Sequence, residues 1–219
     1  MSAVPTRQRR KEARPQELLD AALELFVEKG FAATRAEEVA ARAGVSKGTL
    51  YLYYPSKEEL LKAVIREHLS SRIAAGAAAA DKHRGPVADL LREVFSRWWL
   101  ELFDSPTSGV FKLIITEVRN FPEIAAFYVN DVIRPAEELV ARIVQRGIDS
   151  GEFDALDIPN VVHSLCMPMV MLCVHKHSIG ACTEHHVGFE PHDFVRAHVD
   201  LVVRGLLRNR TATRRAAAA

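Results

Sequence analysis

Apolar side chains recur at the spacing of an α-helix along most of the chain, and no pair of segments has the pattern of a β-hairpin. Leu18, Ala22, Leu25 and Phe26 lie at i, i+4, i+7 and i+8, which predicts an amphipathic helix of about four turns. Gly30 follows this run, at a position where glycine commonly ends a helix. The sequence therefore predicts an all-α protein.

Three further helix starts follow closely. Residues 34–37 (TRAE) match a capping box and predict a second helix that ends near Gly44. Ser46 is the next cap candidate, and Pro55 limits the third helix to about two turns, because the residue before proline disfavours the α conformation. Residues 56–59 (SKEE) match another capping box, from which a long fourth helix is expected to run into an alanine-rich stretch.

Beyond Gly85 the pattern remains helical to about residue 210. Four prolines lie at expected helix starts, where a missing amide costs little: Pro106, Pro122, Pro159 and Pro191. Pro135 and Pro168 lie inside apolar runs, so we expect kinks there.

Composition limits the class of protein. Of the 219 residues, 48% are hydrophobic and the net charge is only +1, which is typical of a soluble globular chain. Any attraction to nucleic acid must therefore be local. Residues 1–14 hold five basic residues and one acidic residue, so we expect this arm to lie along phosphates or enter a minor groove. A disordered, solubilising tail is the alternative. No apolar run indicates a membrane span or a signal peptide, and we expect a cytoplasmic location without membrane contact.

Two helices joined by a glycine-containing turn, the second short and polar, are typical of a helix-turn-helix motif. Such a motif places the N-terminal residues of its second helix against base edges in the major groove. Here those residues are Ser46, Lys47, Gly48 and Thr49. Lysine can reach guanine acceptors, and threonine offers a hydroxyl or a methyl group. The sequence thus predicts that this segment reads DNA.

The residues that follow suit the DNA backbone. Tyr51 and Tyr53 carry phenol hydroxyls on rigid arms, and Lys57 adds a charge at the next helix start, so all three are expected to contact phosphates. Tyr54 is expected to anchor the core. Packing alone for Tyr51, and a solvated position for Lys57, remain alternatives.

Residues 43–61, AGVSKGTLYLYYPSKEELL, resemble the recognition-helix region of TetR-family transcriptional repressors, and the resemblance extends from about Arg14 to Leu61. It implies an all-α homodimer with a DNA-binding head and a helical regulatory body. It also implies DNA contacts from Lys47, Gly48, Thr49, Tyr51, Tyr53 and Lys57, with Thr34 near a phosphate. Leu52 stands where the family often has a polar residue, and Tyr54 replaces the usual phenylalanine.

The chain is accordingly divided into four parts. Residues 1–14 are the basic arm, residues 15–61 the three-helix DNA-binding domain, residues 62–210 the regulatory and dimerisation domain, and residues 211–219 a frayed tail.

A homodimer on a palindromic operator is expected, because one head contacts too few bases for specificity. The last long helix carries an apolar stripe that we assign to the dimer interface: Val195, Val199, Val202, Val203 and Leu206. The nearly all-apolar helix before it, residues 161–174, is expected to pair with it in a four-helix interface.

A small-molecule effector, hydrophobic or aromatic, is expected in the body. Aromatic and methionine side chains, with one polar residue to orient the ligand, are the candidate lining: Trp98, Phe103, Phe111, Tyr128, His163, Met167 and Met171. Adjacent tryptophans on a helix point about 100° apart, so only one of Trp98 and Trp99 is expected to face a cavity.

Other functions are also considered. Residues 175–186 contain several histidines and Cys182, which suggests metal or thiol sensing, although no C-x-x-C pair exists. A nonspecific DNA-binding protein is a further alternative. No nucleophile, phosphate-loop or zinc-protease motif is found, so neither catalytic residues nor a cofactor nor a metal is expected. The favoured interpretation is a ligand-responsive repressor of genes such as those of efflux or detoxification. An activator of such genes is the alternative.

Overall fold

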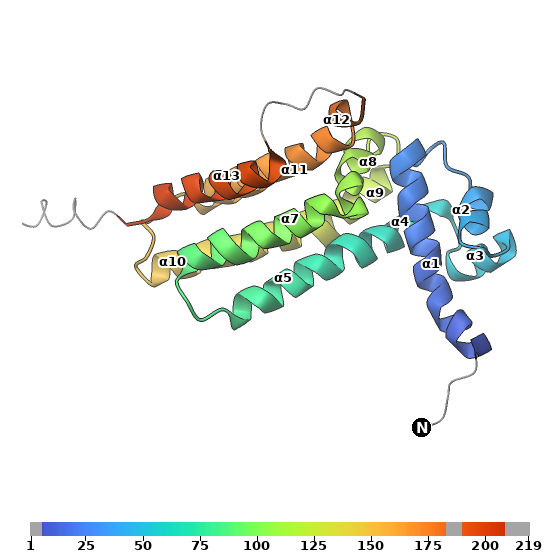
Figure 1. Ribbon diagram of the computed structural model, residues 1–219, viewed down its shortest axis with the longest axis horizontal. Helices are drawn as coiled ribbons and strands as arrows, with labels where there is room; N and C mark the ends of the chain where they lie inside the picture. The colour runs from blue at the N-terminus through green and yellow to red at the C-terminus, as the bar shows by residue number, and fades with distance from the viewer. Residues whose placement is uncertain (1–5, 183–189, 209–219) are drawn as a thin grey trace, which may run out of the picture.

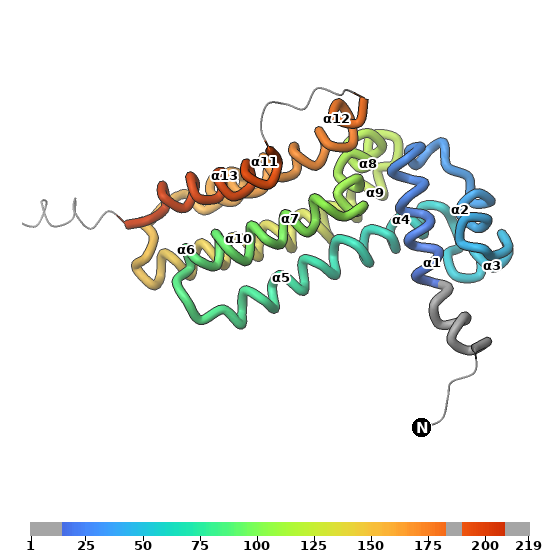
Figure 2. Tube along the Cα trace, in the orientation of Figure 1, coloured from blue at the N-terminus to red at the C-terminus, as the bar shows by residue number. Residues whose placement is uncertain are grey.

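The computed structural model describes residues 6–182 and 190–208, with side chains from residue 15 onward, and the described chain is built from helices (Figure 1). The prediction of an all-α protein is confirmed. A small head at one end of the molecule is followed by an elongated body of roughly parallel and antiparallel helices (Figures 1 and 2). The expected tail at residues 211–219 and residues 183–189 lie outside the described residues.

The head is formed by α1 (Thr6–Lys29), α2 (Ala36–Arg42), α3 (Lys47–Tyr53) and the start of α4 (Lys57–Ile65). Helix α1 begins at Thr6, so the segment assigned to a basic arm enters this helix rather than preceding it. The apolar stripe of α1 is buried against α2, α4 and the body, as its spacing predicted. The fully buried side chains of the head include Leu18, Phe26, Leu50 and Leu61.

The turns between these helices depend on two glycines and two serine caps. Gly30 and Gly44 have φ of 88° and 66°, a conformation that a residue with a side chain rarely adopts, which confirms both predicted helix ends. Ser46 Oγ accepts from the Thr49 amide, and Ser56 Oγ accepts from the Glu59 amide, each at 3.1 Å.

The predicted cap at Thr34 is wrong by one residue. Arg35 is the N-cap of α2, and the Glu38 carboxylate accepts from its backbone amide at 3.0 Å. The Thr34 hydroxyl points inward instead, at 2.7 Å from the Gly30 carbonyl oxygen. A hydroxyl can satisfy that buried helix-end carbonyl, which explains why the threonine is not available as the cap.

The fourth helix connects head and body, as predicted. It runs from α4 through a π-helical turn, η1 (Arg66–Ser70), into α5 (Ser71–Lys82), and Figure 1 shows it passing from the head along the body. Two further π-helical segments interrupt body helices: η2 (Leu90–Phe95) and η4 (Val129–Ile133). Such segments use i→i+5 hydrogen bonds in place of i→i+4 bonds and so interrupt the regular α-helical ladder.

The remaining elements complete the body. In chain order they are α6 (Val87–Asp89), α7 (Ser96–Asp104), the 3₁₀ turn η3 (Pro106–Ser108), α8 (Gly109–Glu117), α9 (Pro122–Tyr128), α10 (Arg134–Asp149), α11 (Ile158–Lys176), α12 (Ile179–Cys182) and α13 (Pro191–Leu206). The four prolines predicted at helix starts all occupy the first or second position of their elements.

The two prolines predicted to kink helices lie at different positions in their helices. Pro135 lies at the start of α10, directly after η4, so the π turn accommodates its missing amide. Pro168 lies inside α11, which continues through it. The stretch Ile158–Cys182 is long and apolar enough to cross a membrane by length and composition, with a mean hydropathy of 1.4 in its most apolar window. It packs against α8, α10 and α13, as a central helix of the body does.

The head contacts the body through small and aromatic residues. Gly109, at the start of α8, approaches Val27 of α1 so closely that an added Cβ would lie 2.4 Å from a Val27 methyl. The rings of Phe31 and Phe121 meet edge to face, with centroids 4.8 Å apart. One continuous apolar cluster therefore spans the head and the near half of the body.

Candidate nucleic-acid interface and effector cavity

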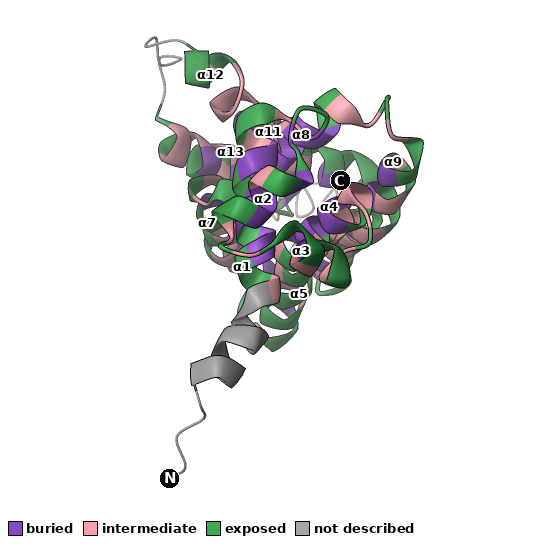
Figure 3. Ribbon diagram, turned by 90° about the vertical axis from the view of Figure 1, so that its right-hand side faces the viewer, coloured by how far each residue is buried: buried purple, intermediate pink, exposed green. Residues whose placement is uncertain are grey.

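The outer face of α3 is exposed at the end of the molecule that Figure 3 views. Ser46, Lys47 and Gly48 are exposed, whereas Leu50 is fully buried in the core cluster of the head, where α3 packs against α2. The Ser46 hydroxyl fixes the first turn through the Thr49 amide. The structure thus brings the four residues predicted to face bases together on one accessible helix end.

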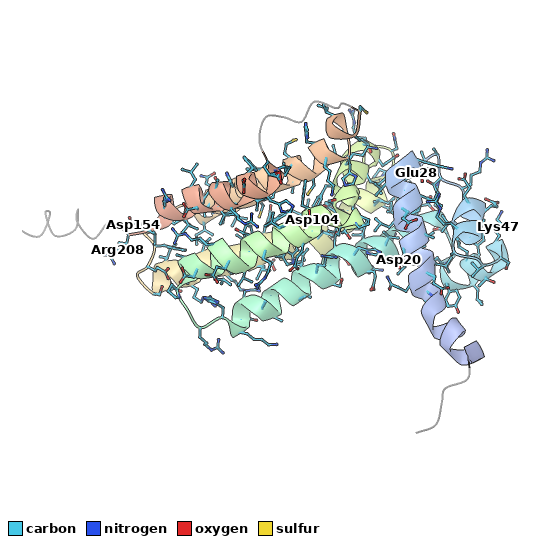
Figure 4. The ribbon with its side chains drawn as sticks, in the orientation of Figure 1. Asp20, Glu28, Lys47, Asp104, Asp154 and Arg208 are labelled. Carbon is cyan, nitrogen blue, oxygen red and sulfur yellow. The ribbon has the colours of Figure 1, made fainter. Side chains whose placement is uncertain are left out.

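Lys47 is paired in the free protein. Its ammonium donates to the Glu37 carboxylate of α2 and lies 5.7 Å from the Tyr51 ring centroid. The hydrogen bond to Glu37 raises the pKa of Lys47, and the same bond lowers the pKa of Glu37. Figure 4 shows Lys47 at the outer edge of the head. Contact with DNA requires its ammonium to exchange this carboxylate for a base or a phosphate.

Tyr51 is more exposed than the other two tyrosines of this segment. It is 39% exposed, beside Leu52, which at 81% is the most exposed large apolar side chain described. Tyr53 is half-buried and packs against the core. Tyr54 is half-buried against the core, and burial raises its pKa. Tyr51 is accordingly placed to meet a partner, whereas Tyr54 has the anchoring position that the sequence predicted.

Two predicted DNA contacts are used inside the protein. Thr34 is 1% exposed and its hydroxyl is bonded to backbone carbonyls, so its side chain does not reach the surface. The Lys57 ammonium donates to the carbonyl oxygens of Phe31, Ala32 and Thr34, at 2.8, 3.2 and 3.1 Å. These bonds use all three donors of a lysine. Both residues shape the turn before α2 rather than offering free groups to phosphates.

A cavity of about 60 Å³ lies in the body, between α5, α7, α10 and α11. Its walls are apolar apart from one thiol and two indoles: Ile73, Gly76, Ala80, Leu90, Val94, Phe95, Trp98, Trp99, Ala136, Leu139, Val140, Ile143 and Cys166. Both tryptophans line it, contrary to the expectation that only one would.

Of the predicted lining residues, only Trp98 borders the cavity. Phe111 and Tyr128 are buried in the core, and Phe103 packs under the Lys176 ammonium. Three others point outward: Met167 and Met171 are 62% and 61% exposed, and His163 is exposed. Sequence reasoning missed the aliphatic walls from α5 and α10, because small and branched residues carry no signal that separates cavity from core.

The apolar stripe assigned to the dimer interface is also corrected. Val195, Val199, Val203 and Leu206 are buried within the chain, and Val202 is half-buried against the same cluster. The exposed residues of α13 lie on the other side and include Ala197, Leu201 and Gly205. Leu201 is 69% exposed. The stripe faces the chain's own core because α13 packs on α7, η2 and α11.

The cysteine and histidine residues do not form a metal cluster within residues 15–182 and 190–208. His185 and His186 lie outside the described residues. Burial raises the pKa of Cys166 and of Cys173 to about 12. Both thiols are therefore protonated and unreactive near neutral pH.

An exposed two-turn helix, held by a buried leucine across a glycine turn from its partner helix, defines a helix-turn-helix DNA-binding protein. The chain belongs to the TetR family of bacterial regulatory proteins: residues 18–64 match the family's DNA-binding region, and residues 81–179 match a tetracyclin repressor-like C-terminal domain.

Relatives agree with this assignment. The HTH-type transcriptional regulator YfiR of Bacillus subtilis is 29% identical over 145 residues, 65% of this chain and 69% of its own. The fatty acid metabolism regulator protein of the same species is 26% identical over 151 residues, 68% of this chain and 76% of its own. The crystal structure of FadR from Bacillus subtilis in complex with stearoyl-CoA superposes with a TM-score of 0.72 at 21% identity, covering 87% of this chain and 98% of FadR.

Proposed function

We propose that this protein is a homodimeric transcriptional repressor in the cytoplasm that leaves a palindromic operator when a hydrophobic small molecule enters its body. The observation that carries the proposal is the apolar cavity, lined by α5, which is continuous with α4 of the DNA-binding head. A ligand that moves α5 would move the head with it.

The junction between head and body supports such coupling. Arg66 in η1 donates to the Asp131 carboxylate in η4 at 3.3 Å, and the Ser70 hydroxyl donates to the Asp131 carbonyl at 3.0 Å. The Arg66 guanidinium also lies 4.6 Å from the Phe127 ring centroid. The two π-helical turns η1 and η4 are thus bonded to each other at the point where the α4–α5 helix passes from the head to the body. A coupling free energy of about 1–3 kcal/mol between cavity and head is enough to change operator occupancy severalfold.

The second copy would add its own α11 and α13 across a two-fold axis. Met167 and Met171 on α11, and Leu201 on α13, are exposed apolar side chains. Exposed apolar surface of this kind is unfavourable in water and often marks a protein–protein interface. The His198 ring lies 2.8 Å from the Ser164 carbonyl oxygen and links the two helices. This surface replaces the buried stripe as the proposed interface.

The relatives favour a lipid-like effector over a planar aromatic one. One is named a regulator of fatty acid metabolism, and one solved neighbour holds stearoyl-CoA. Control of efflux or detoxification genes stays a prediction. An activator would have the same DNA-binding head, so repression rather than activation is itself part of what we propose.

The test is fluorescence anisotropy of the full chain on labelled DNA from upstream of its own gene, beside a scrambled duplex, at about 0.15 M salt. A preference of at least about 10³ for one sequence supports a specific regulator. Equal, weak and steeply salt-dependent binding to both duplexes, and to fragments from a genome-wide selection, would refute it in favour of nonspecific binding.

A further inference from the structure

The body cavity is elongated along the helices that line it. On α5 its lining runs from Ile73 to Ala80, and on α10 from Ala136 to Ile143. Each interval is seven residues, which corresponds to about 10 Å of helix. The ends near Ile73 and Ala136 lie toward the head, because each follows the π turn, η1 or η4, at the head junction. The cavity therefore has a near end and a far end.

A guanidinium marks the far end. Arg146 lies three residues beyond Ile143 on α10, and its Nη1 donates to the carbonyl oxygen of Ala80 at 3.0 Å. Its Nη2 is buried without a hydrogen-bond partner. Among residues 15–182 and 190–208, no carboxylate lies within 4.0 Å of this guanidinium, although twelve other basic side chains there have such a partner.

An unpaired cation with a buried donor is costly unless something pairs with it. Arginine keeps its charge at any physiological pH and presents donors in a fork that fits a carboxylate. Arg146 is not itself a lining residue, but Ala80, whose carbonyl oxygen it binds, is the lining residue at the far end of α5, and no lining residue carries a charge. The cavity and Arg146 together match a molecule with a hydrocarbon body and a negative end.

A second unused donor lies on the cavity wall. Trp98 Nε1 donates to the carbonyl oxygen of Arg72 at 3.0 Å, but Trp99 Nε1 is buried without a partner in the described chain. Trp99 is only 6% exposed. A buried indole N–H ordinarily finds an acceptor. The cavity wall therefore has a hydrogen-bond donor that the protein itself does not satisfy.

We propose that the effector is an anionic amphiphile, a linear hydrocarbon chain ending in a carboxylate, with the carboxylate paired to Arg146 and the chain directed toward Trp98 and Trp99. A cation would be repelled by Arg146, and a neutral hydrocarbon would leave its Nη2 unpaired. A chain of about ten carbons is larger than the 60 Å³ cavity, so the walls must separate. The three π-helical segments adjoin or form those walls. Because π turns interrupt the regular backbone hydrogen bonds of a helix, we expect the helices to bend at these segments when the cavity opens.

This inference rests on the proposed function, in that the cavity is taken as the effector site, but its test needs no DNA. The chain contains two tryptophans, and both line the cavity, so intrinsic fluorescence reports occupancy directly. The purified full chain would be titrated at pH 7.5 with decanoate, decyltrimethylammonium and decanoyl-CoA, each below its critical micelle concentration, and with 1-decanol below its solubility limit. We expect saturable binding of decanoate, with Kd at least about tenfold lower than for decanol or the cation.

Arg146→Gln should raise the Kd for decanoate about tenfold and leave that for decanol unchanged, because glutamine can still donate to the Ala80 carbonyl. Arg142→Gln is the matched control, since Arg142 is exposed on the same helix one turn earlier, and it should change neither Kd. The wild-type comparison of decanoate with decanol holds even if Arg146→Gln fails to fold.

Equal affinity for decanoate and decanol, or binding of decanoyl-CoA alone, would overturn the inference. Decanoate binding without any operator preference would support this inference but contradict the proposed function. Specific operator binding without decanoate binding would support the proposed function but contradict this inference.

Discussion

The Lys57 ammonium donates a 2.8 Å hydrogen bond to the Phe31 carbonyl oxygen and lies 4.5 Å from the centroid of the same residue's ring. Phe31 is fully buried and packs against Phe26 and Phe121. One lysine thus binds the turn between α1 and α2 to the start of α4. A residue that the sequence assigns to DNA holds together the domain that binds DNA.

Replacing Lys57 with methionine should destabilise the protein by about 1–3 kcal/mol, because half-buried carbonyl oxygens lose a charged donor. Urea denaturation followed by circular dichroism measures this. Lys62→Met is the control, since Lys62 makes only a surface pair with Glu59 and should cost less than about 1 kcal/mol. Unchanged stability with lost operator affinity would instead return Lys57 to the DNA interface.

Helix positions, both glycine turns and the recognition helix follow from the sequence, because they depend on local rules: periodicity, caps and proline positions. Val203 and Met167 were assigned to the wrong environments for a different reason. A stripe on one helix says that the face is covered, but not whether the chain itself or a second copy covers it. Thr34 and Lys57 likewise depend on which carbonyls lie near them, which only the tertiary structure decides.

Lys47→Ala should weaken operator binding by about 1–3 kcal/mol, roughly tenfold to a hundredfold, through loss of a base or phosphate contact. Glu37→Gln should strengthen it, since the free ammonium no longer pairs with a carboxylate and a negative charge near phosphate is removed. Anisotropy at several salt concentrations measures both. Arg97→Ala, on the exposed face of α7, should be neutral. Equal affinities for wild type and Lys47→Ala would place the reading residues elsewhere on the head.

The contact of Gly109 with Val27 predicts a reciprocal pair of mutations at the junction of head and body. Gly109→Ala alone should destabilise by about 1–3 kcal/mol, because its Cβ would lie 2.4 Å from a Val27 methyl. Val27→Ala removes both methyls and should cost about 0.5–2 kcal/mol alone. In the double variant the new Cβ fills the vacated space, so its destabilisation should be less than the sum of the two. Thermal unfolding gives the cycle, and strict additivity would contradict the close approach.

His177 predicts acid sensitivity of the body. Its Nε2 lies 2.8 Å from the Ser108 hydroxyl, and burial, followed by the charges of Lys176 and Lys112, lowers its pKa. The unfolded chain therefore binds a proton more readily, and stability is lost as pH falls below the unfolded pKa of about 6.5. The fall in Tm between pH 7.5 and 5.5 should be smaller for His177→Gln than for wild type. His163→Gln, at an exposed histidine, should keep the wild-type fall.

Leu201 separates the proposed dimer interface from the core behind it. It is 69% exposed on α13, whereas Val203, two residues on, is fully buried. Leu201→Glu should give a monomer with a nearly unchanged helical spectrum, because a carboxylate there meets water in one chain but apolar surface in a dimer. Val203→Glu should unfold the body instead, since the charge has no route to solvent.

Light scattering coupled to size exclusion gives the mass of each variant, and circular dichroism its fold. Ile115→Glu is the control, because Ile115 is also exposed, at 55%, but on α8, outside the proposed interface, and it should remain dimeric. A monomeric Leu201→Glu should also lose operator affinity, since one head reaches only one half-site and each half-site alone binds weakly. A dimeric Leu201→Glu that binds the operator normally would show that the two copies meet through another face.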